Sequence, residues 1–155
     1  METEMTCAGQ AAEFFSQGYN CCQSVFLAFA GRYGIDRETA LKLSCSFGGG
    51  MGRMRQVCGA VSGMALICGL ETGNTDCGDR QAKTKNYETM RRLASAFREK
   101  NGSIVCGELL GLSEQEKKGE GAAPSPRTED YYKKRPCKEL VRCAAEILEE
   151  EFHFK

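Results

Sequence analysis

The sequence lacks several features that usually mark catalytic or metal-binding proteins. Its 155 residues contain one histidine, no tryptophan and no Cys-x-x-Cys motif. The single histidine, His153, lies close to the C-terminal end, which argues against histidine-based catalysis or a metal centre with histidine ligands. The missing Cys-x-x-Cys excludes the local spacings of zinc ribbons, thioredoxins and ferredoxins. Any site built from cysteines must therefore combine residues that are far apart in the sequence.

An excess of charge of either sign is also lacking. The chain carries 21 acidic and 21 basic side chains, so its formal net charge is zero. This balance argues against nucleic acid or an anionic membrane as the main partner. No apolar run approaches the roughly 20 residues needed to span a bilayer, and the acidic residues 1–6 lack the pattern of a secretion signal. We therefore expect a cytoplasmic protein with no membrane span and no nucleic-acid partner.

Helical periodicity dominates the sequence, and no segment alternates as a strand does. Apolar side chains recur at helical spacing, and glycines follow several of these stretches as helix ends. Helices are expected at residues 6–17, 21–33, 36–45, 56–69, 79–100, 104–110 and from Pro136 onward. The sequence thus predicts an all-α, compact single-domain bundle of about five to seven helices over residues 1–155. A polar loop excursion is expected at about 113–135, and the length fits one domain.

A glycine-rich turn lies between the third and fourth expected helices, with glycines at 48, 49, 50 and 52. Such glycines permit positive φ angles and leave backbone amides uncovered for binding. The helix that starts beyond the turn adds a partial positive charge, so a thiolate should be favoured at Cys58. Within that helix, Gly59 and Gly63 form a pair that would let a neighbouring helix approach closely. The predicted cofactor-binding positions are Gly48, Gly49, Gly50 and Gly59.

Ten cysteines are unusual in a reducing compartment, where they favour metal, cluster or redox chemistry. Cysteines on apolar stripes or at a helix end are more consistent with a structural role; these are Cys22, Cys45, Cys68 and Cys143. Cys7 and Cys77 have no assigned role. Four others fall within the first turn or so of an expected helix, namely Cys21, Cys58, Cys106 and Cys137. If these helix starts converge, they form an electropositive pocket of up to four sulfurs above the glycine turn. Arg53 and Arg55 either add to its field or have a plain surface role.

Five sequence elements, in order, match a known family: 19–25, 47–52, 58–63, 106–111 and 137–141. With Cys-Gly-Ala-Val-Ser-Gly at 58–63, the sequence resembles the bacterial and archaeal C_GCAxxG_C_C family over roughly residues 10–148. Its signature is a lone cysteine, a Cys-Gly-Ala-x-x-Gly box and two later cysteines. The resemblance implies a redox role, with an iron–sulfur cluster or another prosthetic group as an option. It also implies that the four family cysteines are those at the helix starts, although adjacent Cys21 and Cys22 leave the working thiol of that pair open.

Three functions remain open. In the first, the four cysteines are catalytic: Cys58 or Cys21, as a thiolate, forms a reversible disulfide with another of the four and passes electrons to a redox partner protein. In the second, the same four cysteines ligate a metal or an iron–sulfur cluster. In the third, the chain is a helical structural protein with core cysteines. Under the first two readings, Cys58→Ser should abolish function, whereas Cys68→Ser should only reduce stability.

Overall fold

The computed structural model describes residues 5–154, which form nine α-helices, one 3₁₀ helix and no strand. The elements are α1 (Cys7–Ser16), α2 (Cys21–Ala30), η1 (Gly31–Tyr33), α3 (Arg37–Cys45), α4 (Gly59–Thr72), α5 (Arg80–Asn101), α6 (Cys106–Leu109), α7 (Glu114–Gly119), α8 (Glu129–Lys134) and α9 (Cys137–Phe152). The predicted all-α class is confirmed. The predicted number of helices was slightly low, because it did not count α7 and α8, which have only six residues each.

Most helices begin after a side chain that accepts a hydrogen bond from the first turn. At α2, the side chain of Asn20 accepts from the backbone N–H of Gln23 at 2.9 Å, and the side chain of Gln23 accepts from that of Asn20 at 3.1 Å. Asp36 and Asp79 cap α3 and α5 in the same way through one bond each. Such capping satisfies N–H groups that have no partner within the helix, so these starts could be read from the sequence.

The starts of α4 and α6 differ from the prediction because the chain before each helix is extended. Val57 pairs with Val105 in an isolated antiparallel bridge, and the N–H of Cys106 donates to the carbonyl of Gln56 at 2.6 Å. Helix α4 therefore begins three residues later than predicted, and α6 is only four residues long. This pairing joins segments almost 50 residues apart, so local periodicity could not indicate it.

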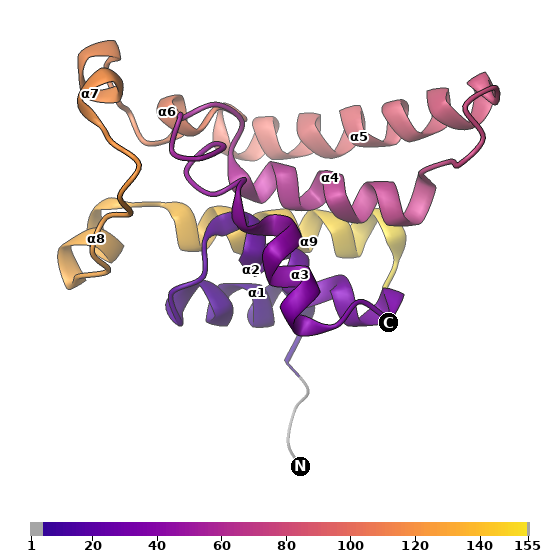
Figure 1. The fold of residues 1–155 in the computed structure, drawn as a ribbon, viewed down its shortest axis with the longest axis horizontal. Coiled ribbons are helices and arrows are strands. Elements are labelled where there is room, and N and C mark those ends of the chain that lie inside the picture. Colours follow the sequence, from indigo (N-terminus) through magenta and orange to yellow (C-terminus); the bar gives the residue numbers. More distant parts are fainter. Residues whose placement is uncertain (1–4, 155) are drawn as a thin grey trace.

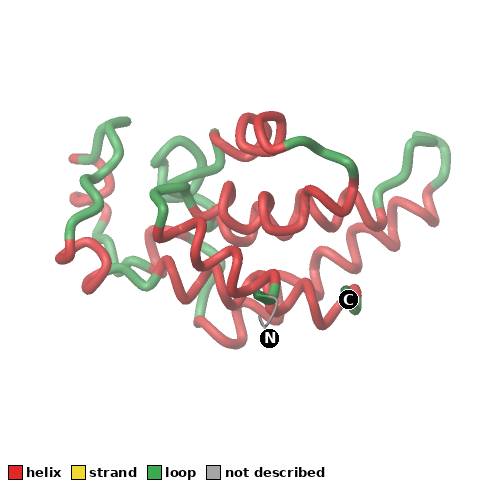
Figure 2. Tube along the Cα trace, turned by 90° about the horizontal axis from the view of Figure 1, so that it is seen from below, coloured by secondary structure: helices red, strands yellow, loops and turns green. Residues whose placement is uncertain are grey.

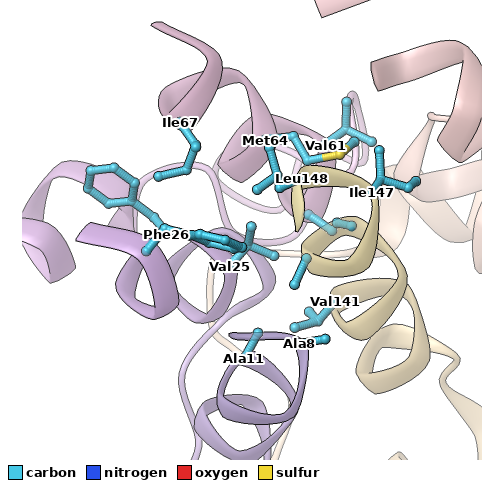
Figure 3. Close-up of a cluster of buried hydrophobic side chains, with 14 of the residues drawn as sticks. Ala8, Ala11, Val25, Phe26, Val61, Met64, Ile67, Val141, Ile147 and Leu148 are labelled. Carbon is cyan, nitrogen blue, oxygen red and sulfur yellow. The ribbon is translucent and has the colours of Figure 1, made fainter. Parts of the chain in front are cut away.

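The core lies where α1, α2, α4 and α9 meet. Helices α4, α5 and α9 run along the long axis of the molecule (Figure 1), α1 packs on α9 and α2, and α2 packs on α4. Figure 3 shows Val25 and Phe26 of α2, Met64 of α4 and Val141 of α9 among the side chains of this core. All four are almost completely shielded from solvent. The core thus fixes the directions of the helices whose N-terminal ends form the site described below.

Helices α2 and α4 come close enough that only glycine fits between them at two positions. A Cβ atom at Gly63 would lie 2.8 Å from the Cβ of Val25, and one at Gly59 would lie 3.1 Å from the Cβ of Cys21. Both distances are shorter than ordinary carbon–carbon contacts. The prediction that Gly59 and Gly63 allow a neighbouring helix to approach is therefore confirmed. As a result, Cys21 lies against the start of α4.

The excursion at 113–135 is more ordered than the predicted loop, since it contains α7 and α8. Ser113 and Thr128 cap these helices with their side-chain oxygens. Neither helix contains a buried residue, so the sequence carries no apolar stripe that would reveal them. Both views place the excursion at one end of the molecule (Figures 1 and 2).

The longest helix, α5, does not have the character of a membrane span. Its 22 residues are long enough, but arginines and lysines are spread along it. Within residues 5–154, no helix is both long enough and apolar enough to cross a bilayer.

Candidate functional site: a cavity lined by four cysteines

Four cysteines from distant parts of the chain line one cavity of about 60 Å³: Cys21, Cys58, Cys106 and Cys137. Three of them are the first residues of α2, α6 and α9, and Cys58 directly precedes α4. Figure 1 shows the starts of α4, α6 and α9 at the same end of the molecule, next to the excursion. The structure therefore brings together the four residues that the sequence singled out. Their catalytic role is a separate matter and stays a prediction.

Short backbone pairings hold these helix starts together. The N–H of Cys58 donates to the carbonyl of Ile104 at 2.8 Å, and the N–H of Gly107 donates to the carbonyl of Arg55 at 3.2 Å. These bonds place Cys58 and Cys106 on neighbouring extended segments. A Cβ atom at Gly50 would lie 2.7 Å from the Cβ of Cys106, so the glycine-rich turn also lies directly against this wall. The cavity is thus built from local pairings as well as from the helical core.

Cys21 and Cys137 form a hydrogen-bonded pair. The thiol of Cys21 donates to the sulfur of Cys137, and this hydrogen bond, together with the positive charges of Arg135 and Arg127, outweighs burial and lowers the pKa of Cys137 to about 7. The same hydrogen bond, together with burial, raises the pKa of Cys21 well above its usual value. As the pH rises above about 7, the pair therefore increasingly holds one thiolate, on Cys137, and one thiol, on Cys21.

The pKa of Cys58 is shifted in the direction opposite to the prediction. Burial raises its pKa to about 12, although the backbone N–H groups of Ala60 and Val61 at the start of α4 act in the opposite direction. Only 3% of its surface is exposed, so the cost of desolvating a thiolate exceeds the benefit of the helix N-terminus. The expectation that Cys58 is the favoured thiolate is therefore wrong. Burial also raises the pKa of Cys106, despite a contact of 3.6 Å between its Sγ and Nη1 of Arg55.

The glycine-rich turn uses most of its own amides. The N–H groups of Gly52 and Gln56, for example, donate to carbonyls of Ser46 and Gly50 at 2.8 and 2.9 Å. The N–H groups of Gly49 and Gly50 donate to no other residue in the described range 5–154, and both glycines line the cavity.

The other two predicted cofactor-binding glycines are placed differently. A Cβ atom at Gly48 would lie 2.5 Å from the side-chain nitrogen of Asn20, so this glycine is in tight contact with that side chain. Gly59 lines the cavity, where it packs against Cys21. Both glycines therefore have steric reasons to be small. Whether any of the four binds a cofactor stays a prediction.

Arg53 and Arg55 clamp the excursion onto the turn. Nε and Nη2 of Arg55 donate to the two carboxylate oxygens of Glu120, each at 2.7 Å, and Arg53 donates to the same carboxylate at 2.8 Å. Arg53 also donates to the carbonyls of Gly121 and Ala123. The hydrogen bond from Arg55 lowers the pKa of Glu120. Because Arg55 is 4% exposed, the plain surface role does not apply to it.

The remaining cysteines lie outside this cavity. Cys22 and Cys68 are buried, as predicted for core cysteines, whereas Cys143 is only half-buried. Cys45 and Cys77 are exposed. Cys7 is the first residue of α1 and accepts a hydrogen bond from a neighbouring arginine at 3.5 Å.

Three residues of the cavity wall were missed in the sequence: Arg127, Tyr131 and Arg135. They belong to the excursion, which was predicted as a polar loop, and its composition does not show whether it covers the pocket. The only available signal was two arginines and an aromatic residue shortly before Cys137, which does not distinguish a cavity wall from a solvated segment. Their position depends on how the excursion folds back over α1, which no local pattern specifies.

The four sulfurs are suitable ligands for a metal or an iron–sulfur cluster, but their arrangement does not fit a single metal ion. Among residues 5–154, no three Cys, His, Asp or Glu side chains are positioned to hold a metal ion. Thiolate ligation requires sulfurs at about 2.3 Å from a common metal centre. We therefore derive no chemical step through such a group.

Comparison with known proteins gives one match. The profile of the family described as "Putative redox-active protein (C_GCAxxG_C_C)" matches residues 19–151. This range includes all four cysteines of the cavity, the glycine-rich turn and the excursion. No curated protein and no solved structure matches the chain.

Proposed function

Because the chain belongs to the C_GCAxxG_C_C family, which is described as redox-active, we propose that it is a cytoplasmic thiol redox protein. Cys21 and Cys137 are its working pair and alternate between a dithiol and a disulfide. The position of Cys21 and Cys137 in one cavity carries this proposal, and the lowered pKa of Cys137 beside the Cys21 thiol supports it. A thiolate whose pKa lies near the ambient pH is the best nucleophile for thiol–disulfide exchange.

The reaction with a substrate disulfide has two steps. First, the Cys137 thiolate attacks one substrate sulfur, a mixed disulfide forms and the other half of the substrate leaves as a thiolate. That thiolate accepts the proton of Cys21, and the Cys21 sulfur then attacks the sulfur of Cys137. The Cys21–Cys137 disulfide forms and the second half of the substrate leaves. The substrate gains two electrons and the cysteine pair loses two. A redox partner protein whose thiol protrudes far enough to enter the cavity, or a small thiol, returns the pair to the dithiol.

The positive side chains assist the first step. Arg127 and Arg135 both favour the thiolate of Cys137, so they keep the nucleophile ionised in a cavity that would otherwise protonate it. Cys21 stays protonated until the mixed disulfide removes its negatively charged acceptor. The pair therefore orders the two steps, since Cys21 becomes a nucleophile only after Cys137 has reacted.

A thiol titration of anaerobically purified protein tests the proposal. Mild oxidation should remove two free thiols, reversibly, and mass spectrometry without reduction should find the Cys21 and Cys137 peptides linked. Cys137→Ser should abolish this loss. Cys68→Ser is the matched control, because Cys68 is buried on α4 outside the cavity, and it should retain the loss. Linkage of other cysteines in the wild type would refute the assignment.

A metal or cluster carrier using Cys21, Cys58, Cys106 and Cys137 is the alternative. The shared cavity supports a cluster, although within residues 5–154 no side chains are positioned to hold a single metal ion. Iron and sulfide analysis of the same sample separates the two functions. A cluster requires all four cysteines, whereas the dithiol requires only Cys21 and Cys137. Brown protein with stoichiometric iron and sulfide, lost in Cys58→Ser, would replace the dithiol proposal. Thiols that react only after denaturation would instead leave a helical protein with core cysteines.

A further inference from the structure

A second, larger cavity of about 320 Å³ lies beside the cysteine cavity. We call it the arginine vestibule. Its outer wall includes Arg53, Pro124 and Ser125 from the turn and the excursion. The residues that line both cavities are Asn20, Gly49, Arg55, Arg127, Tyr131 and Arg135. Because they share this wall, the vestibule lies directly next to the cavity of the four cysteines.

The vestibule is strongly positive in an otherwise neutral protein. Its charged lining residues are all arginines: Arg53, Arg55, Arg127 and Arg135. Glu120 forms ion pairs with the first two. Neither Arg127 nor Arg135 lies within ion-pair distance of a carboxylate in the described part of the chain. In the described part of the chain, two of the four positive charges therefore have no direct ion pair, although Arg135 interacts with Glu120 at longer range.

These two arginines are held by neutral groups, which fix their position without cancelling their charge. Arg127 donates to the carbonyls of Phe15 and Tyr19 at 3.0 and 2.9 Å, and its guanidinium lies 4.2 Å from the centre of the Phe15 ring. The guanidinium of Arg135 lies 5.2 Å from the centre of the Tyr131 ring. Cations fixed in this way are prepared for an anion before it arrives, so less conformational freedom is lost on binding.

The burial of the thiols limits the size of the substrate. Cys137 and Cys106 are each 8% exposed, and Cys58 is 3% exposed. The disulfide of a folded protein is attached to a surface too large to follow a sulfur into the vestibule. A small molecule has no such restriction, and its charge decides how well it fits a wall of guanidinium groups. Carboxylates are well suited, because a guanidinium can donate two parallel hydrogen bonds to each.

We propose that the arginine vestibule binds the carboxylates of a small anionic disulfide and thereby presents its S–S bond to Cys137. This inference rests on the proposed dithiol function and names its substrate class. Arg127 and Arg135 bind the carboxylates, and the exchange then follows the two steps given above. Two small carboxylate-bearing thiols are released for each Cys21–Cys137 disulfide formed.

Two small disulfides of opposite charge test the inference. Oxidised glutathione carries carboxylates and a net negative charge, whereas cystamine carries two ammonium groups. The rate of Cys21–Cys137 disulfide formation is measured with each, anaerobically at pH 7.5, in the wild type and in two variants. Arg135→Gln removes a vestibule charge, and Arg91→Gln is the matched control because Arg91 is exposed on α5. The ratio of the two rates is the readout, since it cancels any change in the ionisation of Cys137.

The wild type should react faster with oxidised glutathione, and added salt should reduce this preference. Arg135→Gln should lower the ratio roughly fivefold, as expected for one charge contact in a partly hydrated site, whereas Arg91→Gln should leave it unchanged. A ratio near one in the wild type, or one that Arg135→Gln does not change, would overturn the inference and leave the dithiol proposal intact.

A second measurement separates failure of the inference from failure of the proposed function. S-Methylglutathione carries the same carboxylates but cannot exchange, so calorimetry reports its binding alone. If neither disulfide oxidises the pair, the dithiol proposal fails. Binding of S-methylglutathione that Arg135→Gln weakens would then still support the anion site, and absence of binding would overturn it.

Discussion

Cys137 and Cys58 show how two cysteines at helix starts can acquire opposite chemistry. Both are almost completely buried, which by itself opposes ionisation. Cys137 has a hydrogen-bond donor, Cys21, and nearby guanidinium groups, and its pKa falls to about 7. Cys58 has only backbone N–H groups, and its pKa rises to about 12. A hydrogen bond and nearby positive charges therefore decide which buried sulfur can act as a nucleophile.

This difference predicts the pH dependence of alkylation. The folded-state pKa of Cys137 is lowered, so its thiolate should be present above about pH 7 and disappear as the pH falls through that value. Labelling by iodoacetamide, followed by mass spectrometry, should therefore be half-maximal near pH 7 at Cys137 and negligible at Cys58. Cys21→Ala removes the donor and should shift the Cys137 profile to higher pH. Cys21→Ser keeps a donor and should shift it less, so equal profiles in all three proteins would contradict the pairing.

The contact between α2 and α4 is the element on which the position of Cys21 depends. Gly63→Ala should destabilise the protein by about 1–3 kcal/mol, because the new methyl group would overlap the side chain of Val25. Gly69→Ala is the control on the same helix, since nothing lies within 4 Å of its added Cβ. That substitution should be neutral or stabilise by about 0.5–1 kcal/mol. Urea denaturation measures both, and an equal effect of the two substitutions would refute the close contact.

The ion pairs of Glu120 with Arg53 and Arg55 form a second contact between elements, and we call them the clamp because they hold the excursion on the glycine-rich turn. Glu120→Gln removes the carboxylate shared by Arg53 and Arg55, so limited proteolysis within 113–135 should become severalfold faster. Glu114→Gln, in the same excursion but with an exposed side chain, should change little. Because the folded-state pKa of Glu120 is lowered, its stabilising effect is present above its ordinary value of about 4.3 and is lost as the pH falls through the lowered value. Equal cleavage of both variants would argue against the clamp.

The sequence predicts those elements that local interactions form, and it does not predict those that depend on contacts between distant segments. Helices α1, α2, α3, α5 and α9 were found because caps and apolar stripes are local properties of the sequence. The starts of α4 and α6 were misplaced because Val57 and Val105 meet only in the folded chain. The meeting of the four cysteines was expected from their helix-start positions, but the order of their pKa values depends on burial. The vestibule positions of Arg127 and Arg135 could not be predicted, because a polar segment does not indicate which part of the folded chain it packs against.

For the whole molecule, formation of the proposed disulfide has a thermodynamic consequence. A Cys21–Cys137 bond joins α2 to α9 and encloses well over 100 residues. Cross-links that close loops of this length restrict the unfolded chain and stabilise by about 2–5 kcal/mol. The oxidised protein should therefore unfold at a higher temperature than the reduced protein in calorimetry. The same oxidant should not change the melting temperature of Cys21→Ser, and a shift of equal size in that variant would exclude this bond as the cause.

The excursion supplies Arg127 and Arg135 to the vestibule. Its two helices contain no fully buried residue, and their contribution to the core is limited to Tyr131 and Tyr132, which pack against Phe15. Ligand selectivity therefore depends mainly on the excursion, whereas the stability of the helical body depends mainly on the buried residues of the long helices. Grafting a different segment between Ser113 and Pro136 would retarget the protein to molecules of another charge while the four thiols keep their scaffold. An engineer seeking a sensor for a chosen metabolite could confine randomisation to this one stretch.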